Sequence, residues 1–451
     1  MNRSAFLAVL AVPLLASAET LTVASAVERA LTAAPEVAIA RASAEEAAAS
    51  ARAARATLRP EAVITTTPGY AVGLPAAVAG RVPAWAGVEV RQTLYDASAR
   101  AQALAAGAAT LAPEAALEVA RRDVARVTLE TYGLAWRGQS LVALARRRLE
   151  TRTALLSQAK ALEREGRLTQ LDVDRVALDE ARARQKLLQA EGERDLALLA
   201  LKRLTGLAPD ASVVLGEDPA LSLSKRAGVF GAAPDSAAEI ASAKSPATPS
   251  AERPATMTEA MADDPLLRAL SREVEELKIS ARLASRWLQP VVVAAGQYQR
   301  LSRGTGFDRF YLSFEENSAV VGLSVAVPVL TGGRLQEAGR RARASLARAE
   351  GRRQAREAEL AGLVSEAEVG LRNALAGRVV ARQAEGVSEE ALRVARLLEA
   401  EGRGEPGATE KASLAASDAA EELTRADHDL LLARTRSLAA RGELLPTLGL
   451  R

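Results

Sequence analysis

The side chains that could carry out chemistry are few in this chain of 451 residues. It contains no Cys and one His, which excludes thiol catalysis, disulfide bonds and Cys/His metal sites. His428 has no second His with which to form an HExxH pair. The glycine-rich run from Gly402 lacks the preceding strand and the Lys-Ser/Thr of a phosphate-binding loop. No nucleophile–base constellation is present either, so we expect no catalytic residue, no cofactor and no metal, and an enzyme is the least favoured class.

Charged side chains gather instead at two glycine turns that resemble each other. Residues 165–168 read EGRL and residues 401–404 read EGRG, each after a long helical pattern. Gly166 and Gly402 favour left-handed caps, because glycine adopts positive φ without steric cost. Taken alone, this is ordinary helix-end chemistry. Elsewhere Arg and Glu are interspersed and the net charge is only +3, which indicates solvated helix faces and no nucleic-acid partner.

The turns close long helical segments that occur twice. Ala, Arg, Glu and Leu dominate and aromatic residues make up 3%, a composition that favours long helices. An earlier helix in each half is opened and closed by proline, at Pro35 and Pro60 and again at Pro265 and Pro290. An internal repeat is the simplest account, and Pro113 should kink the first long helix. The long helices are expected at 97–165 and 169–204, and at 335–401 and 409–441.

Segments with strand character lie between the early and the long helices. In the second half Val321, Leu323 and Val325 alternate with small residues, and this period of two indicates a strand. A surface hairpin of a soluble domain would show the same alternation. The expected strands are 61–72, 84–95, 291–301 and 318–330.

Aromatic residues concentrate in and beside these strands. They are Tyr70, Trp85, Tyr95, Trp287, Tyr298, Phe307, Phe310, Tyr311 and Phe314. Aromatic girdles flank the apolar band of transmembrane β-barrels, although strands attract aromatic residues generally. An open sheet edge in hydrocarbon costs several kcal/mol per unpaired group, and a barrel needs about eight strands. Four strands cannot close alone, so a membrane barrel requires several copies of the chain.

The N-terminus has the features of a secretory signal. Arg3 precedes an apolar run at 5–15 that is too short to span a bilayer, and small residues follow at 16–18. A membrane anchor is the competing interpretation, but no later stretch reaches about 18 apolar residues without a charge. The expected organisation is a signal peptide at 1–18, a first repeat at 19–207, a partly flexible linker at 208–255 and a second repeat at 256–451.

In this duplicated order the sequence resembles the TolC-like outer-membrane efflux proteins. The resemblance is carried by residues 26–60 and 257–290, by VPVLTGGR at 327–334 and by the segment 163–183. It implies a mainly α fold with a membrane β-barrel: a homotrimeric 12-stranded barrel, four strands per chain, continued by a long periplasmic α-helical barrel. It also implies an equatorial domain built from the linker at 208–255 and the C-terminal region. It further implies a passive exit duct in the outer-membrane lipid, whose partners are a periplasmic adaptor protein and, through it, an inner-membrane pump.

The resemblance also assigns roles to the turns. It places them at the periplasmic tips, where charge rings could gate the duct. The residues expected to dock the adaptor are Gly166, Arg167, Leu168, Gly402, Arg403 and Gly404. The aperture charges expected are Glu165, Asp172, Glu401, Glu405 and Glu410. Similar proteins often carry acids six and nine positions after the second turn glycine, where this chain has Ala408 and Lys411, so its aperture is expected to be less acidic or wider.

Two other functions remain open at this point. The duct of a type I protein secretion system would have similar tips. A soluble periplasmic coiled-coil adaptor or scaffold would explain the helices but not the duplicated strand pairs with their aromatic residues.

Overall fold

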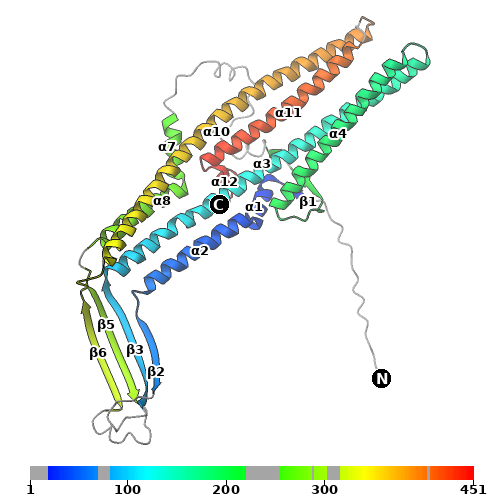
Figure 1. The fold of residues 1–451 in the computed structure, drawn as a ribbon. Helices are drawn as coiled ribbons and strands as arrows, with labels where there is room; N and C mark the ends of the chain where they lie inside the picture. The colour runs from blue at the N-terminus through cyan, green and yellow to red at the C-terminus, as the bar shows by residue number, and fades with distance from the viewer. Residues whose placement is uncertain are drawn as a thin grey trace, which may run out of the picture. The chain divides into compact units, whose positions relative to one another are not determined.

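The computed structural model describes residues 19–69, 82–216, 218–219, 253–286, 289–301, 315–403 and 407–450. Helices dominate, as the composition predicts (Figure 1). The signal peptide predicted at 1–18 lies outside the described residues. In chain order the elements are β1 Glu19–Leu21, α1 Val23–Ala33, α2 Pro35–Ala56, β2 Glu61–Gly69, β3 Val82–Asp96, α3 Ala97–Arg164, α4 Gln170–Leu204, β4 Val213–Leu215, α7 Arg253–Asp263, α8 Pro265–Ala284, β5 Val291–Leu301, β6 Asn317–Ala326, α10 Arg334–Ala400, α11 Ala408–Ala440 and α12 Leu444–Thr447.

The chain forms two compact units, and each unit takes segments from both predicted repeats. Unit 1 comprises Met1–Ala38, Val119–Asp264 and Glu359–Arg451, and unit 2 comprises Ile39–Glu118 and Pro265–Ala358. The long helices α3 and α10 run through both units. A repeat is therefore not a compact body by itself, because its two ends pack with the matching ends of the other repeat.

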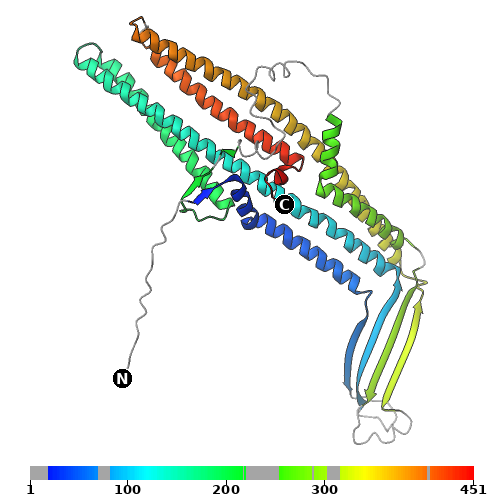
Figure 2. The same ribbon diagram turned by 180° about the vertical axis from the view of Figure 1, so that it is seen from behind.

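Unit 2 contains a four-stranded antiparallel sheet in the order β2-β3-β5-β6 (Figures 1 and 2). Ile64 is paired with Val88, which is paired with Tyr298, so these three side chains share one face. Val321 joins the same face through Gly296. The other face carries polar and charged residues: Glu61, Glu89, Arg91, Gln297, Gln299 and Ser318. The sheet is thus amphipathic, as the alternation in the sequence predicts.

Some predicted strand ends are wrong. The strand expected at 318–330 ends at Ala326, since Pro328 has no N–H to donate to a neighbouring strand. Val329 consequently lies outside the sheet and is 93% exposed. β3 begins at Val82, before the expected residue 84. Residues 70–72 of the first expected strand lie outside the described residues, as do 220–252 of the linker.

The helices of unit 2 form a row in the order α2–α3–α8–α10. A Cβ at Gly107 of α3 would lie 2.9 Å from the Arg55 side chain of α2. The Ser280 hydroxyl of α8 donates to the Ala101 carbonyl of α3 at 2.9 Å. Between α8 and α10, Arg352 lies 4.0 Å from the Glu273 carboxylate. Small residues at these contacts allow the backbones to approach closely.

Unit 1 repeats this arrangement in the order α4–α3–α11–α10 (Figures 1 and 2). A Cβ at Gly138 of α3 would lie 2.9 Å from the Arg194 Cα of α4. α3 and α11 are joined by Arg148 and Asp418 at 2.5 Å, and α10 and α11 by Arg378 and Asp427 at 2.6 Å. The row has two different ends, α4 and α10.

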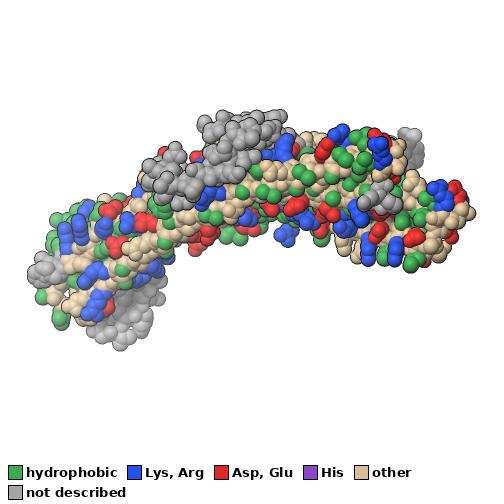
Figure 3. Space-filling model, turned by 90° about the horizontal axis from the view of Figure 1, so that it is seen from above, with side chains coloured by type: hydrophobic (Ala, Val, Ile, Leu, Met, Phe, Trp, Pro, Cys, Tyr) green, Lys and Arg blue, Asp and Glu red, His purple; other side chains and the backbone are tan. Residues whose placement is uncertain are grey.

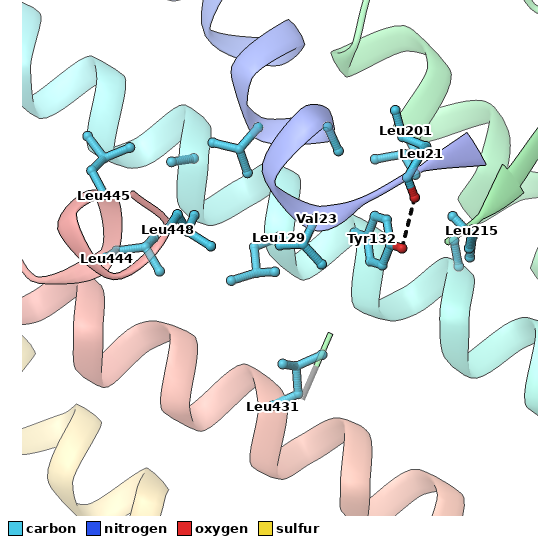
Figure 4. Close-up of a cluster of buried hydrophobic side chains, with 14 of the residues drawn as sticks. Leu21, Val23, Leu129, Tyr132, Leu201, Leu215, Leu431, Leu444, Leu445 and Leu448 are labelled. Atoms are coloured by element: carbon cyan, nitrogen blue, oxygen red, sulfur yellow. Dashed lines mark hydrogen bonds between the residues drawn. The ribbon is translucent and has the colours of Figure 1, made fainter. Parts of the chain in front are cut away.

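The hydrophobic core of unit 1 gathers segments that are far apart in sequence (Figure 4). β1 pairs with β4 in parallel, and the fully buried Tyr132 of α3 donates its hydroxyl to the Leu21 carbonyl at 3.0 Å. Leu201 of α4 and Leu444 of α12 pack into the same cluster. The first strand of the chain is therefore fixed in the core.

One described helix, α3, contains a stretch long and apolar enough to cross a membrane by length and composition alone. α3 also continues through Pro113 as one helix. Its buried alanines, among them Ala101 and Ala108, pack against neighbouring helices of the same chain. Alanine accounts for the apolar composition of this stretch. Its small side chain also makes the helix narrow enough for the close contacts of the row.

Candidate functional site: the two helix tips

The first tip, between α3 and α4, turns at a left-handed glycine. Gly166 has φ of +71°, and its N–H donates to the Glu163 carbonyl at 2.8 Å. The Arg167 N–H donates to the Leu162 carbonyl at 2.9 Å. These two bonds form a Schellman cap, which satisfies carbonyls that the helix end leaves free. The predicted glycine cap is observed, and Leu168 follows it half-buried.

The second tip, after α10, has the same construction. Gly402 has φ of +68°, and the Arg403 N–H donates to the Leu398 carbonyl at 2.9 Å. Each turn also carries an exposed ion pair across its glycine, Arg167 with Glu165 at 3.4 Å and Arg403 with Glu401 at 3.5 Å. Both turns therefore present the same exposed charged motif. Gly404 and Glu405 lie outside the described residues.

Asp172 has a local structural role at the first tip. It forms a capping box with Thr169, whose hydroxyl and N–H donate to the Asp172 carboxylate at 2.6 and 3.2 Å. These hydrogen bonds, with a smaller contribution from Arg175, lower the pKa of Asp172. The carboxylate thus stays charged and caps the first turn of α4.

Glu410 lies in the first turn of α11 and pairs with Arg152 of α3. The Arg152 side chain is almost fully buried, so this ion pair lies between the neighbouring helices α3 and α11 and is not part of the exposed turn. Arg148, one turn earlier on the same face of α3, binds Asp418. Neither arginine stands out in the sequence. The only signal is the spacing of four residues between the two arginines, which places them on one face of the helix. Charged residues at that spacing are frequent in this chain.

The two helix starts differ. α4 begins with the Thr169 capping box, whereas α11 begins after Gly407, which has φ of +79° and makes no side-chain cap. Without a side-chain cap, the start of α11 is held less firmly than the start of α4. Ala408 and Lys411 follow there, so the described part of the second tip carries Glu410 as its first-turn acid.

The sheet of unit 2 presents an exposed apolar face. Ile64 on β2 is 80% exposed and Val321 on β6 is 90% exposed, and Leu323 and Val325 follow Val321 on the same face of β6. β2 and β6 each pair with one strand only, so both sheet edges have unpaired backbone groups within the described chain. Of the predicted girdle, Tyr95 and Tyr298 lie on described strands. The side chain of Trp85 and the whole of Tyr70, Trp287, Phe307, Phe310, Tyr311 and Phe314 lie outside the description.

Charges of both signs are mixed on the helix surfaces that Figure 3 shows. On the face seen in Figure 3, basic and acidic side chains alternate along the helices. Within the described residues, no group of three or more His, Asp and Glu side chains is placed to hold a metal ion. The features that distinguish the molecule are therefore its two charged tips and its amphipathic open sheet.

No known family profile matches the chain, and no curated protein sequence matches it. Several solved structures, however, match the chain. The outer-membrane channel OprN is 17% identical with a TM-score of 0.69, and the match covers 93% of this chain and 90% of OprN. The outer membrane protein VceC of Vibrio cholerae is 16% identical with a TM-score of 0.68, covering 93% and 96%. The MtrE outer membrane channel of Neisseria gonorrhoeae, in its open state, is 18% identical with a TM-score of 0.66, covering 95% and 89%. The chain has the fold of the TolC-like outer-membrane channels.

Proposed function

We propose that this chain is one copy of a trimeric exit duct in the outer membrane, part of a tripartite efflux system. The observation that carries the proposal is the sheet, which has one exposed apolar face, one charged face and two unpaired edges. Such a sheet is stable in hydrocarbon only when its edges are paired, because water is absent there to bind the free N–H and C=O groups. Three copies supply twelve strands and leave an aqueous lumen lined by the charged face.

Conduction through this duct is passive. β3 is followed directly by α3, so the chain passes from strand to long helix without a linker. Substrate moves through water, and the inner-membrane pump supplies the energy. The turns around Gly166 and Gly402 contact a periplasmic adaptor protein, with Arg167 and Arg403 as exposed cations. Glu165 and Glu401 line the aperture beside them.

Two arginine substitutions on one strand test the proposal. Val321 and Val320 are neighbours on β6, both are exposed, and their side chains lie on opposite faces of the sheet. Val321→Arg places a charge against lipid, at a cost of about 2–4 kcal/mol near the bilayer midplane. Val320→Arg places the same charge toward water. We expect the first variant to lose outer-membrane assembly and the second to retain it.

The measurement is recovery of the full chain in the outer-membrane fraction of a Gram-negative host, with channel conductance in planar bilayers. Equal recovery of both variants, or recovery of the unsubstituted chain in the soluble periplasm without detergent, would contradict the proposed duct. A soluble scaffold predicts that outcome, since both valines would face water.

A further inference from the structure

The exposed apolar surface of unit 2 extends beyond the end of the sheet. Val327, Val329 and Leu330 follow β6 in the turn that leads to α10, and Leu330 is 95% exposed. Gly332 and Gly333 complete this turn with positive φ of +59° and +85°. No segment of the described chain covers Val329 or Leu330, so the apolar surface continues from the sheet into the turn.

Three strands meet their helices at the same level. Asp96 at the end of β3 is paired with Val291 at the start of β5, and Val291 is paired with Ala326 at the end of β6. The strands therefore pass into the helical part side by side (Figures 1 and 2). We call residues 96–100, 286, 289–291 and 326–334 the strand–helix junction.

The strand–helix junction has an excess of positive charge. It contains three exposed arginines, one beyond each strand end: Arg100, Arg286 and Arg334. Within the described residues none of these guanidinium groups forms an ion pair. The one acid of the junction is Asp96, whose carboxylate caps α3 by accepting from the Ser98 N–H at 2.8 Å. Glu337, one turn into α10, pairs with Arg340 at 2.8 Å.

Helix packing brings the three arginines to one end of unit 2. The Ser280 hydroxyl of α8 donates to the Ala101 carbonyl of α3 at 2.9 Å. A Cβ at Gly339 of α10 would lie 3.4 Å from the Ser285 Cα, just after α8. All four of these residues lie within two helical turns of an arginine of the junction. The three cations are therefore carried by adjacent helices.

Arg100 lies at the end of the apolar face. Its guanidinium carbon is 5.4 Å from the centre of the Tyr95 ring and lies over the ring. Tyr95 is paired with Val292, which is paired with Val325, so the tyrosine belongs to the apolar face. A tyrosine with a cation above it suits the boundary between hydrocarbon and water, because the ring tolerates an apolar environment and the charge requires a polar one.

The apolar turn and the arginines together specify one class of occupant. Exposed apolar side chains are stabilised by contact with hydrocarbon, and unpaired arginines are stabilised by an anion at its edge. An anionic phospholipid supplies both in one molecule, and its phosphate oxygens suit the planar guanidinium. A nucleic acid or an acidic peptide would leave Val329 and Leu330 in water.

We propose that the strand–helix junction binds anionic phospholipids of the periplasmic leaflet of the outer membrane. The phosphate groups lie against Arg100, Arg286 and Arg334, and the acyl chains lie against Val329 and Leu330. The inference deepens the proposed duct, on which it rests for the orientation of the sheet in the membrane. It adds a headgroup preference that a barrel with a neutral junction would lack.

Lipid binding to the full chain, extracted from outer membranes in dodecyl maltoside, tests the strand–helix junction. The probe is fluorescent phosphatidylglycerol, displaced by unlabelled phosphatidylglycerol, phosphatidylcholine or inorganic phosphate. We expect phosphatidylglycerol to displace the probe on the order of 100-fold better than phosphatidylcholine, since each arginine beside an anionic headgroup contributes roughly fivefold. Inorganic phosphate should be a poor competitor, because it makes no apolar contact.

Two variants separate the charged part of the site from the apolar part. Arg100→Gln/Arg286→Gln/Arg334→Gln should lose the preference for phosphatidylglycerol over phosphatidylcholine. Val329→Ser/Leu330→Ser should weaken the binding of both lipids equally, because it removes only apolar contact. The matched control replaces three exposed arginines of unit 1, Arg147, Arg203 and Arg396, by Gln. It changes the net charge by the same amount and should retain the preference.

Three results would overturn the lipid site. Equal affinity of the unsubstituted chain for both lipids would mean that the arginines are only solvated. Displacement by inorganic phosphate as effective as by phosphatidylglycerol would indicate an anion site that needs no lipid. An unchanged lipid preference in the triple arginine variant, with altered ion selectivity in planar bilayers, would place the arginines toward the lumen.

Fractionation distinguishes failure of the lipid site from failure of the duct. A chain recovered in the outer membrane that shows no lipid preference retains the duct and refutes the site. A chain recovered in the soluble periplasm whose binding to phosphatidylglycerol vesicles requires the three arginines retains the site and refutes the duct.

Discussion

Acid should loosen the contact between α3 and α11 at His428. This residue is 5% exposed, and neither ring nitrogen has a hydrogen-bond partner among the described residues. It lies beside Gly133 of α3, where an added Cβ would be 3.5 Å from the ring and 2.6 Å from Leu431. The backbone of Gly133 faces the ring without meeting hydrogen-bond geometry. The site therefore accommodates a neutral ring and offers little to a charged one.

The pKa of His428 is lowered to about 4, chiefly because burial removes the water that would solvate the charged ring. The Arg137 guanidinium of α3 lowers this pKa further. Asp429 on α11 and Glu130 on α3 act in the opposite direction but do not compensate. His428 is thus neutral in the folded chain at neutral pH.

The sign of the pH effect follows from these values. The unfolded side chain binds a proton near pH 6.5 and the folded one only near pH 4, so the opened state binds more protons between them. The contribution of the neutral His428 to folding stability is fully present above pH 6.5, and it falls as the pH drops from 6.5 toward 4. At pH 4.5 the loss is about 2.5 kcal/mol, which multiplies the population of the opened state by roughly 70.

Hydrogen exchange of the α11 amides in the full chain measures this opening. After correction for intrinsic rates, we expect protection around residue 428 to fall on the order of 70-fold between pH 7 and pH 4.5. His428→Leu is the matched variant, because an apolar side chain of similar size has no proton to bind. An equal fall in that variant would refute the reasoning and assign the effect to groups other than His428.

Three further predictions concern other parts of the chain. Tyr132→Phe removes the hydroxyl bond to the β1 carbonyl and should cost about 1 kcal/mol in thermal or urea unfolding; an unchanged midpoint would show the bond to be dispensable. Gly402→Ala forces a side chain into positive φ and should destabilise the tip by about 1 kcal/mol, whereas Gly386→Ala in the interior of α10 should stabilise by a similar amount. Arg152→Gln leaves Glu410 without its cation and should speed proteolysis at the second turn several-fold, for a loss of about 1–2 kcal/mol. Adding Glu410→Gln should restore part of the resistance, and no recovery would argue against a direct pair.

The features that the sequence predicts correctly depend on local rules. Alternation around Val321 predicts a face of β6, because successive side chains of a strand point to opposite sides. Gly166 and Gly402 predict the helix ends, since both need positive φ. The strand end was predicted too late, although Pro328 carried the information.

The contacts that the sequence did not predict join distant parts of the chain. Arg152 and Glu410 are 258 residues apart, and no periodicity shows that α3 and α11 are neighbours. The pairing of β1 with β4 has three residues on each side, too short a pattern to detect. No local pattern predicts the burial of His428, because it depends on Gly133 of another helix.

The internal repeat does not preserve the chemistry of equivalent positions. Inside the chain, α3 meets α11 through ion pairs of Arg148 and Arg152 with acids. An offset of 236 residues relates α3 to α10, and at the equivalent positions α10 has Ala384 and Ser388, beside the exposed Val387. A contact within one chain benefits from the high effective concentration of its halves, so ion pairs that contribute little net free energy suffice between α3 and α11. Duplication of one hairpin thus explains the common helix pattern of α3 and α10, whereas the two arginines belong to the contact that α3 alone makes with α11.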